Sequence, residues 1–394
     1  MKKLLYLSGA PRVSTRPNAE RVGPRTHVKG VIRGFEKNNW VVHQYIVGDN
    51  VPESWNTKGS EKSIQSSVVK QFGADLIRIV LNYINRKKIL KIDEQFDLVY
   101  ERFAAFQYLG YDLKIKRNIP WILETNAILS IESSSERKST ALPSKLQKYE
   151  KFAYQNCDVL VCITEELKEL IIQKFNIDPN KIIISPNAVN IEEFSSENHD
   201  PLKFNDLFNI GFVGSLWQWQ RLDFLFDAVK ELQGQGLEIS ITIVGDGQCA
   251  DEWKNYAKLI NIDNVKFVGK VKREDVPRYI SGFDVCYSGQ FSMGMGSYLS
   301  PIKMYEYMAM GKPILATSYG ETKRLVTDGE NGYLFNENDK ENLKKAIKKL
   351  YSDKDLRILM GLKSRNLVLS NHSWQIRVKS ILSNIEDVLN RNLI

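Results

Sequence analysis

The sequence has no long apolar run. Of its 394 residues, 43% are hydrophobic and 26% are charged, yet no uninterrupted apolar stretch approaches the roughly 20 residues that a membrane-spanning helix needs. Near the N-terminus, the run Leu4–Leu7 ends at Ser8 and is closely followed by Gly9. This pattern predicts a strand rather than the apolar region of a secretory signal. We therefore expect a cytoplasmic protein.

Cysteine is scarce and follows no known motif. The chain has four cysteines with neither zinc-finger nor redox-motif spacing, each in or beside an apolar stretch: Cys157, Cys162, Cys249 and Cys286. They are predicted to be reduced core residues. No spaced cluster of histidine and aspartate indicates a metal site, so we expect no metal ion.

Acidic residues are outnumbered. The chain has 55 Lys and Arg against 47 Asp and Glu, a formal net charge of +8. The lysines are spread along the chain without an aromatic-basic motif, so phosphate-bearing substrates or an anionic membrane explain the charge better than nucleic acid does. The basic amphipathic stretch from Arg78 to Lys91 fits two interpretations: peripheral contact with the inner membrane face, or an ordinary helix of the first domain.

The length and the order of predicted elements indicate two domains. Short apolar runs alternate with longer amphipathic stretches over residues 1–195, a pattern typical of a parallel sheet with helices on both faces. A polar linker follows at about 192–205, and the alternation restarts over 206–372. The expected fold is α/β, with two Rossmann-like, doubly wound domains facing a cleft.

The elements expected in each domain are named by residue range. Strands are expected at 3–8, 41–47, 98–100, 121–124, 159–163, 182–185, 209–213, 239–244, 265–268, 285–287 and 313–316. Helices are expected at about 26–38, 64–90, 104–117, 144–156, 223–233, 251–259, 273–281 and 301–310, with another after Thr164. Residues 373–394 are expected to form a C-terminal helix whose apolar stripe packs back on the first domain.

The segment Ser300–Ile314 has the features of a nucleotide site. Pro301 suits the first turn of a helix, whose free amides favour a phosphate, and Lys303 would add a countercharge. Glu306 lies nearly one turn beyond and can accept hydrogen bonds from two adjacent ribose hydroxyls. The alternative is an exposed i,i+3 ion pair between Lys303 and Glu306.

This segment resembles the donor site of the retaining glycosyltransferases of family 4, which have the two-domain GT-B fold. Further matching segments follow in the family's order over nearly the whole chain: Ser185–Asn190 with Phe194, Gly211–Gly214, Ile243–Gly247, Val265–Gly269 and Asp328–Leu334. The resemblance implies metal-independent transfer, with retention, of a hexose-type sugar from a UDP- or GDP-sugar. The implied acceptor is a glycan or a lipid-linked sugar, in surface polysaccharide or glycoconjugate biosynthesis.

The sequence departs from the family's donor signature. That signature is two glutamates separated by seven residues, and here Glu306 holds the second position while Tyr298 holds the first. The basic residue that often follows the glycine of the first loop in the second domain is replaced by Ser215. Arg221, a few residues later, is a candidate substitute.

These departures resemble one branch of the family. Its loop has the pattern G-S-x-x-x-W-x-G, which Gly214, Ser215 and Trp219 fit in part, and its donor helix has the pattern S-P-x-K-x-x-E-Y. In that branch we expect Lys303 to neutralise the diphosphate charge.

Candidate residues on the acceptor side come from the first domain. Gly23 permits close backbone approach and Arg25 could reach a phosphate. His27 is a candidate catalytic residue, or equally a helix residue half-buried against the sheet. The segment Glu124–Ala127, with Glu132, follows a strand end and is a candidate for orienting the acceptor or the transferred sugar.

The predicted site residues fall into three sets. The catalytic candidates are Lys303, Arg221, Asn126 and His27. The donor-binding candidates are Gly23, Gly214, Ser215, Gly245, Val268, Lys270, Leu299, Ser300, Pro301, Ile302, Lys303 and Glu306. The acceptor-side candidates are Arg25, Glu124 and Glu132.

Two other functions remain open. Gly245–Ala250 fits the dinucleotide fingerprint G-x-G-x-x-A, which would suit a nicotinamide oxidoreductase, but the acidic residue expected about 20 positions later is replaced by Val268–Lys270. Because half of the donor signature is missing, the chain could also be a catalytically silent nucleotide-sugar-binding partner of another transferase.

Overall fold

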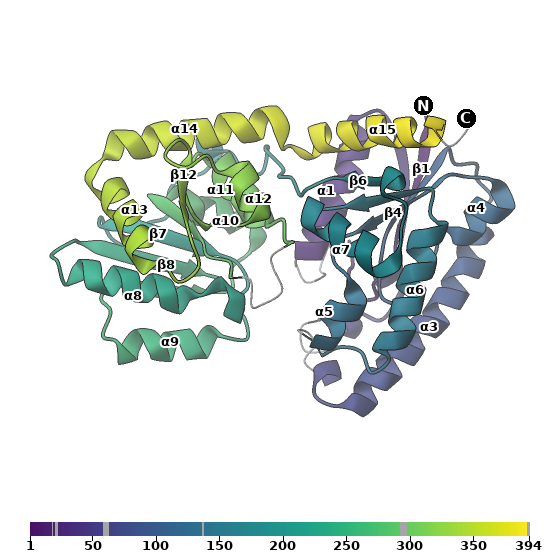
Figure 1. Cartoon of the computed structure of the whole chain (residues 1–394), viewed down its shortest axis with the longest axis horizontal. Helices are drawn as coiled ribbons and strands as arrows, with labels where there is room; N and C mark the ends of the chain where they lie inside the picture. The colour runs from purple at the N-terminus through teal and green to yellow at the C-terminus, as the bar shows by residue number, and fades with distance from the viewer. Residues whose placement is uncertain (18, 20–22, 58–62, 136–137, 292–297, 392–394) are drawn as a thin grey trace. The chain divides into compact units, whose positions relative to one another are not determined.

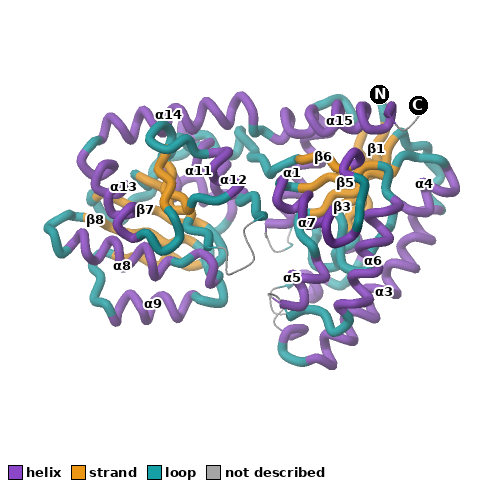
Figure 2. The backbone as a smooth tube through the Cα atoms, in the orientation of Figure 1, coloured by secondary structure: helices purple, strands orange, loops and turns teal. Residues whose placement is uncertain are grey.

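The computed structural model describes residues 1–17, 19, 23–57, 63–135, 138–291 and 298–391. The chain divides into two compact units, Met1–Pro186 together with Trp374–Ile394, and Asn187–Ser373. Residues 187–195, which the sequence assigned to the first domain, lie in the second unit. Each unit is a parallel sheet with its strands enclosed by helices, as Figures 1 and 2 show.

The first unit has a six-stranded parallel sheet in the order β2-β1-β3-β4-β5-β6. Its strands are β1 (Lys3–Ser8), β2 (Val41–Ile46), β3 (Leu98–Arg102), β4 (Trp121–Thr125), β5 (Val159–Cys162) and β6 (Ile182–Ile184). Its helices are α1 (Gly23–Lys37), α3 (Val68–Leu90), α4 (Tyr111–Arg117), α5 (Leu129–Ser135), α6 (Pro143–Asn156), α7 (Glu165–Phe175) and α15 (Trp374–Arg391). Every residue of β4 and β5 is buried, as expected when helices cover both faces of a parallel sheet.

The C-terminal helix α15 belongs to the first unit and packs on α1. Two glycines on α1 permit the close approach. A Cβ atom on Gly30 would lie 2.3 Å from Trp374, and one on Gly34 would lie 2.5 Å from Val378. The prediction that the last helix returns to the first domain is confirmed, although residues 392–394 lie outside the described part of the chain.

The helix predicted over 104–117 is wrong in its first half, because α4 begins at Tyr111. Phe106 has a positive φ of 62°, which a continuous helix does not allow. The buried Glu101 carboxylate accepts hydrogen bonds from two backbone amides of this segment, each 2.8 Å long. Burial raises the pKa of Glu101 to about 7. These long-range bonds to β3 replace the helical ones.

The second unit also has a six-stranded parallel sheet, in the order β12-β11-β10-β7-β8-β9. Its strands are β7 (Phe208–Val213), β8 (Ile239–Val244), β9 (Val265–Gly269), β10 (Val285–Ser288), β11 (Ile314–Thr317) and β12 (Gly332–Phe335). Its helices are α8 (Leu222–Gln233), α9 (Ala250–Leu259), α10 (Val276–Ser281), α11 (Ile302–Ala309), α12 (Gly320–Leu325), α13 (Lys340–Ser352) and α14 (Lys354–Asn371). The strand order reverses between β7 and β10, the arrangement of a doubly wound nucleotide-binding sheet.

Several helices start away from their predicted positions, and two of these starts, those of α1 and α11, bear on the candidate site. Helix α1 begins at Gly23, so Gly23–Arg25 form its first turn instead of a preceding loop. Pro24 is compatible with this because the first turn of a helix needs no amide donor there. In α11, Pro301 is the residue before the first helical position, Ile302.

All four cysteines are buried and free. Burial raises the pKa of the Cys157 thiol to about 12 and the pKa of the other three above their usual value. Within the described part of the chain, no helix combines the length and apolar character needed to cross a bilayer.

Candidate functional site

The topology of the second unit points to a binding site beyond β7 and β10. In open α/β sheets, ligands bind outside the carboxyl ends of the strands, where the strand order reverses. The segment after β7 begins at Gly214, and the segment after β10 leads into α11. Residues 292–297 of the latter lie outside the described residues. The residues predicted to bind a donor therefore follow the strands that the topology selects.

Two glycines hold the loops after β7 and β8 against each other. Gly214 and Gly245 have φ values of 152° and 136°, which side-chain-bearing residues rarely adopt. The Gly214 amide donates to the Val244 carbonyl at 3.0 Å, and the Gly245 amide donates to the Gly269 carbonyl at 2.8 Å. A Cβ atom on Gly245 would lie 1.9 Å from the Gly214 carbonyl oxygen. Gly245, part of the apparent dinucleotide fingerprint, thus serves loop packing.

Lys303, in the first turn of α11, faces the loop after β7. A Cβ atom on Gly214 would lie 3.8 Å from Lys303 Nζ. The ammonium donates to Gln220 Oε1 and lies 4.2 Å from the centre of the Phe212 ring. Burial lowers the pKa of Lys303 to about 7, with Glu306 opposing the shift. Its hydrogen-bond partner Gln220 is neutral, so the charged form of Lys303, which predominates below about pH 7, can attract an anion in this loop.

Glu306 is buried and bound to an arginine that the sequence did not single out. Its Oε1 accepts a hydrogen bond from Arg273 at 2.5 Å, and Arg273 also donates to Glu193 at 2.8 Å. The guanidinium lies 4.5 Å from the centre of the Phe194 ring. The alternative of an exposed Lys303–Glu306 ion pair is therefore wrong, because Glu306 is buried and pairs with Arg273.

The start of α11 is fixed by buried hydrogen bonds. Asn187 binds both the hydroxyl and the carbonyl of Ser300, at 3.0 and 2.5 Å. The Tyr305 hydroxyl lies 3.2 Å from Ser300 Oγ and donates to Glu321 at 2.5 Å. The Tyr307 hydroxyl accepts from the Val213 amide at 2.7 Å. The two Asn187 bonds hold together the segments Pro186–Asn187 and Ser300–Pro301, although Asn187 and Ser300 are 113 residues apart.

Arg221 is held by local contacts. It has a positive φ of 43°, its Nε donates to both oxygens of Asp223 at 3.0 Å, and it lies 4.8 Å from the Phe291 ring centre. Its catalytic role stays a prediction.

The other predicted donor-binding residues lie around the same strands of the second unit. Ser215 is exposed directly after Gly214, and Val268 lies in β9 with exposed Lys270 just beyond the strand. Leu299 and Ile302 flank Ser300 and Pro301.

The first unit has a row of polar side chains at the carboxyl end of its sheet. Strand register places Ser8 opposite Arg102, and Arg102 opposite Glu124, across β1, β3 and β4. This is the edge beyond β1 and β3 where the strand order reverses. Ser8 Oγ and Arg102 Nε are buried without a hydrogen-bond partner among the described residues. Buried polar atoms without a partner need an explanation, and a polar ligand or an ordered water at this edge would supply the missing hydrogen bonds.

Glu124 and His27 form a buried pair in this row. Their side chains are 3% and 4% exposed, and His27 Nε2 contacts Glu124 Oε1. Burial alone would raise the pKa of Glu124, but His27 and Arg102 lower it below the ordinary value. The His27 ring also meets Trp374 of α15 edge-on, with centroids 5.1 Å apart. The histidine is thus more buried than the half-buried helix residue that the sequence suggested.

The other acceptor-side candidates lie after β4. Asn126 follows the strand directly, and its Oδ1 is buried with no hydrogen-bond partner among the described residues. Glu132 lies in α5, whose first amides, at Leu129 and Ser130, donate to Glu150 at 2.5 and 3.0 Å. The structure brings Glu124 and His27 into contact, whereas Glu132 is placed on a separate helix.

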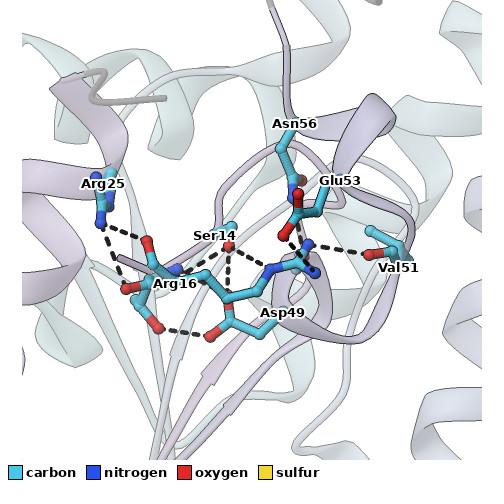
Figure 3. A network of polar contacts seen from close by, with 9 residues as sticks. Ser14, Arg16, Arg25, Asp49, Val51, Glu53 and Asn56 are labelled. Carbon is cyan, nitrogen blue, oxygen red and sulfur yellow. Dashed lines mark hydrogen bonds and ion pairs between the residues drawn. The ribbon is translucent and has the colours of Figure 1, made fainter. Parts of the chain in front are cut away.

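Arg25 helps to order the loop between β1 and α1 (Figure 3). Its guanidinium donates to the Arg16 carbonyl at 2.6 Å and to two further loop carbonyls. Asp49 accepts from Ser14 Oγ at 2.6 Å and from the Thr15 amide at 2.7 Å. Arg16 donates to the carbonyls of Gly48 and Val51, at 2.9 and 3.0 Å. These contacts favour a positioning role for Arg25, and its contact with phosphate stays a prediction.

Both halves of the chain match known families. Residues 23–193 match the family described as Glycosyltransferase Family 4, and residues 208–353 match the family described as Glycosyl transferases group 1. The chain is a glycosyltransferase of the GT-B fold. This assignment decides against the oxidoreductase alternative.

Three proteins illustrate the likeness. The glycosyltransferase is 26% identical over 388 residues to an uncharacterized glycosyltransferase of Methanocaldococcus jannaschii, covering 93% of this chain and 95% of the other. It is 28% identical over 316 residues to the UDP-Gal:alpha-D-GlcNAc-diphosphoundecaprenol alpha-1,3-galactosyltransferase of Escherichia coli, covering 78% and 79%. Anabaena HepE, crystallised in complex with UDP, superposes with a TM-score of 0.65 at 15% identity, covering 98% and 100%.

Sequence patterns missed two arginines of this glycosyltransferase. Arg273 lies just after β9 in a basic segment, and Arg102 ends β3. The available signal was their position, since Arg102 is the last residue of a strand and Arg273 follows shortly after another, at the carboxyl ends where ligands bind in a doubly wound sheet. Among the described residues, no group of three or more His, Cys, Asp or Glu side chains could hold a metal ion.

Proposed function

We propose that this glycosyltransferase moves a hexose-type sugar from a UDP-sugar to a lipid-linked acceptor, with retention of anomeric configuration. The observation that carries the proposal is the Lys303 ammonium held beside Gly214 with a neutral partner, Gln220. Support for the donor comes from the UDP-galactose named for the Escherichia coli relative and the UDP bound to HepE. GDP remains the alternative nucleotide.

On this proposal, the second unit binds the nucleotide diphosphate. The Gly214 loop and the start of α11 surround the diphosphate, and Lys303 neutralises charge on the leaving group. Preorganised electrostatic stabilisation of that charge is the main catalytic contribution, and no metal ion is required. Glu306, oriented by Arg273, accepts hydrogen bonds from the ribose hydroxyls.

The first unit would bind the acceptor and the transferred sugar. Glu124 is charged at neutral pH because its pKa is lowered, and it fixes the ring of His27. Asn126 and Arg102 supply polar atoms at the same edge of the sheet. The diphosphoundecaprenol acceptor named for the Escherichia coli relative supports a lipid-linked acceptor. On this proposal the reaction takes place in the cytoplasm beside the membrane.

A screen of nucleotide sugars by thermal shift, followed by slow hydrolysis of the best donor, tests this proposal. We expect a UDP-sugar to stabilise the protein and to release UDP over time. Lys303→Met should lose both effects, whereas Lys348→Met, an exposed lysine of α13, should keep them.

A second candidate is a catalytically silent binder of nucleotide sugars. It is favoured by Tyr298 at the position of the first signature glutamate. Stabilisation by a nucleotide sugar without turnover against any lipid-linked acceptor would support this candidate and contradict the first.

A further inference from the structure

Helix α3 buries mainly polar side chains and exposes most of its large apolar ones. Its buried residues are Gln71, Asp75, Asn82, Asn85 and Ile89. Its exposed large apolar residues are Val68, Val69, Phe72, Leu76, Ile77, Val80, Tyr83 and Ile84. A surface helix normally shows the opposite distribution, so this exposed face requires an explanation other than packing within the unit.

The inverted orientation of α3 is fixed by specific hydrogen bonds. Asp75 accepts from Thr140 Oγ1 at 2.8 Å and from the Ala141 amide at 2.9 Å. Asn82 accepts from the Tyr108 amide at 3.2 Å, and Asn85 accepts from the Tyr45 hydroxyl at 2.8 Å. Rotating the helix to bury its apolar face would break all four of these bonds. The apolar face is therefore a stable feature of the folded unit.

The charges on the exposed face are positive. Across α3, which the structure describes in full, the exposed charged residues are Lys70, Lys87 and Lys88, and Lys91 follows at its C-terminal cap. The helix has one acidic residue, Asp75, which is buried.

The arginines of α3 are engaged within the unit. Arg78 pairs with Asp75 at 2.7 Å, and Arg86 pairs with Asp112 at 2.6 Å. The exposed lysines thus form the cationic part of the face. Of the basic residues in the stretch Arg78 to Lys91 that the sequence suggested, the two arginines are paired with carboxylates inside the unit. A long apolar stripe flanked by lysines is complementary to a surface with an apolar interior and anionic groups at its boundary with water.

We propose that the exposed face of α3 binds the surface of a membrane containing anionic lipids. The helix would lie in the plane of the interface, with the apolar side chains inserted among the acyl chains and the lysines contacting lipid phosphates. Its 23 residues span about 34 Å, enough for the whole stripe to engage at once. A second copy of the chain fits less well, because like-charged lysines would meet.

Flotation of the full-length protein with vesicles tests this surface. One vesicle set is phosphatidylcholine alone, and the other contains about one third phosphatidylglycerol. We expect binding to the anionic vesicles and weaker binding at high salt. Lys87→Gln with Lys88→Gln should weaken it roughly 25-fold, since each lysine near an anionic surface contributes about fivefold. Val80→Glu with Tyr83→Glu should weaken it at least as much.

A matched control lies on α14. Ile358 and Leu359 are also exposed, at 53% and 52%, and Ile358→Glu with Leu359→Glu should leave vesicle binding unchanged. The inference does not depend on the identity of the donor, so hydrolysis of a soluble nucleotide sugar should be the same in all these variants. Absence of binding to anionic vesicles would overturn the proposal, as would equal binding by the α3 variants. A dimer that dissociates when α3 is changed would also overturn it.

Discussion

Replacing Lys303 with methionine removes the cation beside the Gly214 loop while keeping most of the side-chain volume. The ammonium is held by Gln220 and lies near Gly214, where the proposed diphosphate would bind. Hydrogen bonds to charged groups contribute about 1.5–3 kcal/mol. Their loss should lower kcat/KM for donor hydrolysis by roughly ten- to one-hundred-fold.

The pH dependence of donor binding gives a second measure of the same group. Because burial lowers the pKa of Lys303 to about 7, the free protein carries this charge below neutral pH and loses it above. If only the charged form binds, the Kd for UDP should rise roughly thirtyfold between about pH 6 and about pH 8.5. Lys303→Arg keeps its charge over this range, so its Kd should lose the part of the dependence that belongs to Lys303.

Calorimetry with UDP and an assay of released UDP measure these effects. Lys348→Met serves as the control, since that lysine is exposed on α13. If Lys303→Met kept its kcat/KM, or if wild type and Lys303→Arg showed the same pH dependence, Lys303 would not neutralise the diphosphate.

Three further predictions concern contacts around the two candidate sites. Arg273→Met leaves the Glu306 carboxylate buried without its partner, which should cost about 3–5 kcal/mol in folding stability and weaken UDP binding. Thermal melts and calorimetry measure the two effects, and an unchanged melting temperature would contradict the prediction. Gly245→Ala places a Cβ atom against the Gly214 carbonyl and should reduce donor binding more than tenfold, as measured by titration. An unchanged affinity would show that the two loops can separate to make room for the methyl group. Glu124→Gln should lower the rate of transfer to an acceptor at least tenfold while leaving UDP binding intact; an equal loss of UDP binding would indicate a general folding defect. In the wild type, the stability that the charged Glu124 carboxylate supplies should be lost as the pH falls through its lowered pKa.

Local sequence patterns predicted the parts of the fold that depend on local periodicity. The alternation of apolar strands and amphipathic helices indicated two doubly wound sheets, and the apolar stripe of α15 indicated its return to the first domain. The first half of the helix predicted at 104–117 was wrong because its conformation depends on Glu101, a residue of β3 outside that segment. The apolar periodicity of residues 104–117 cannot predict hydrogen bonds to a residue outside that segment.

The candidate site could be predicted only where its residues share one segment. Lys303 and Glu306 lie on the same helix turn, so their residue types and spacing indicated a diphosphate and a ribose. Arg273 contacts Glu306 from 33 positions away, and Arg102 lies beside Glu124 through strand register. The first pairing depends on how the segment after β9 packs against α11, and the second depends on strand register. A single sequence specifies neither residue by residue.

A crystal structure of the protein soaked with UDP tests the central claim most directly. We expect the diphosphate within about 3 Å of Lys303 Nζ, beside the Gly214 loop, and the ribose hydroxyls on Glu306. A nucleotide bound elsewhere in the second unit, or a Lys303 that still donates to Gln220 and not to the diphosphate when UDP is present, would contradict the account.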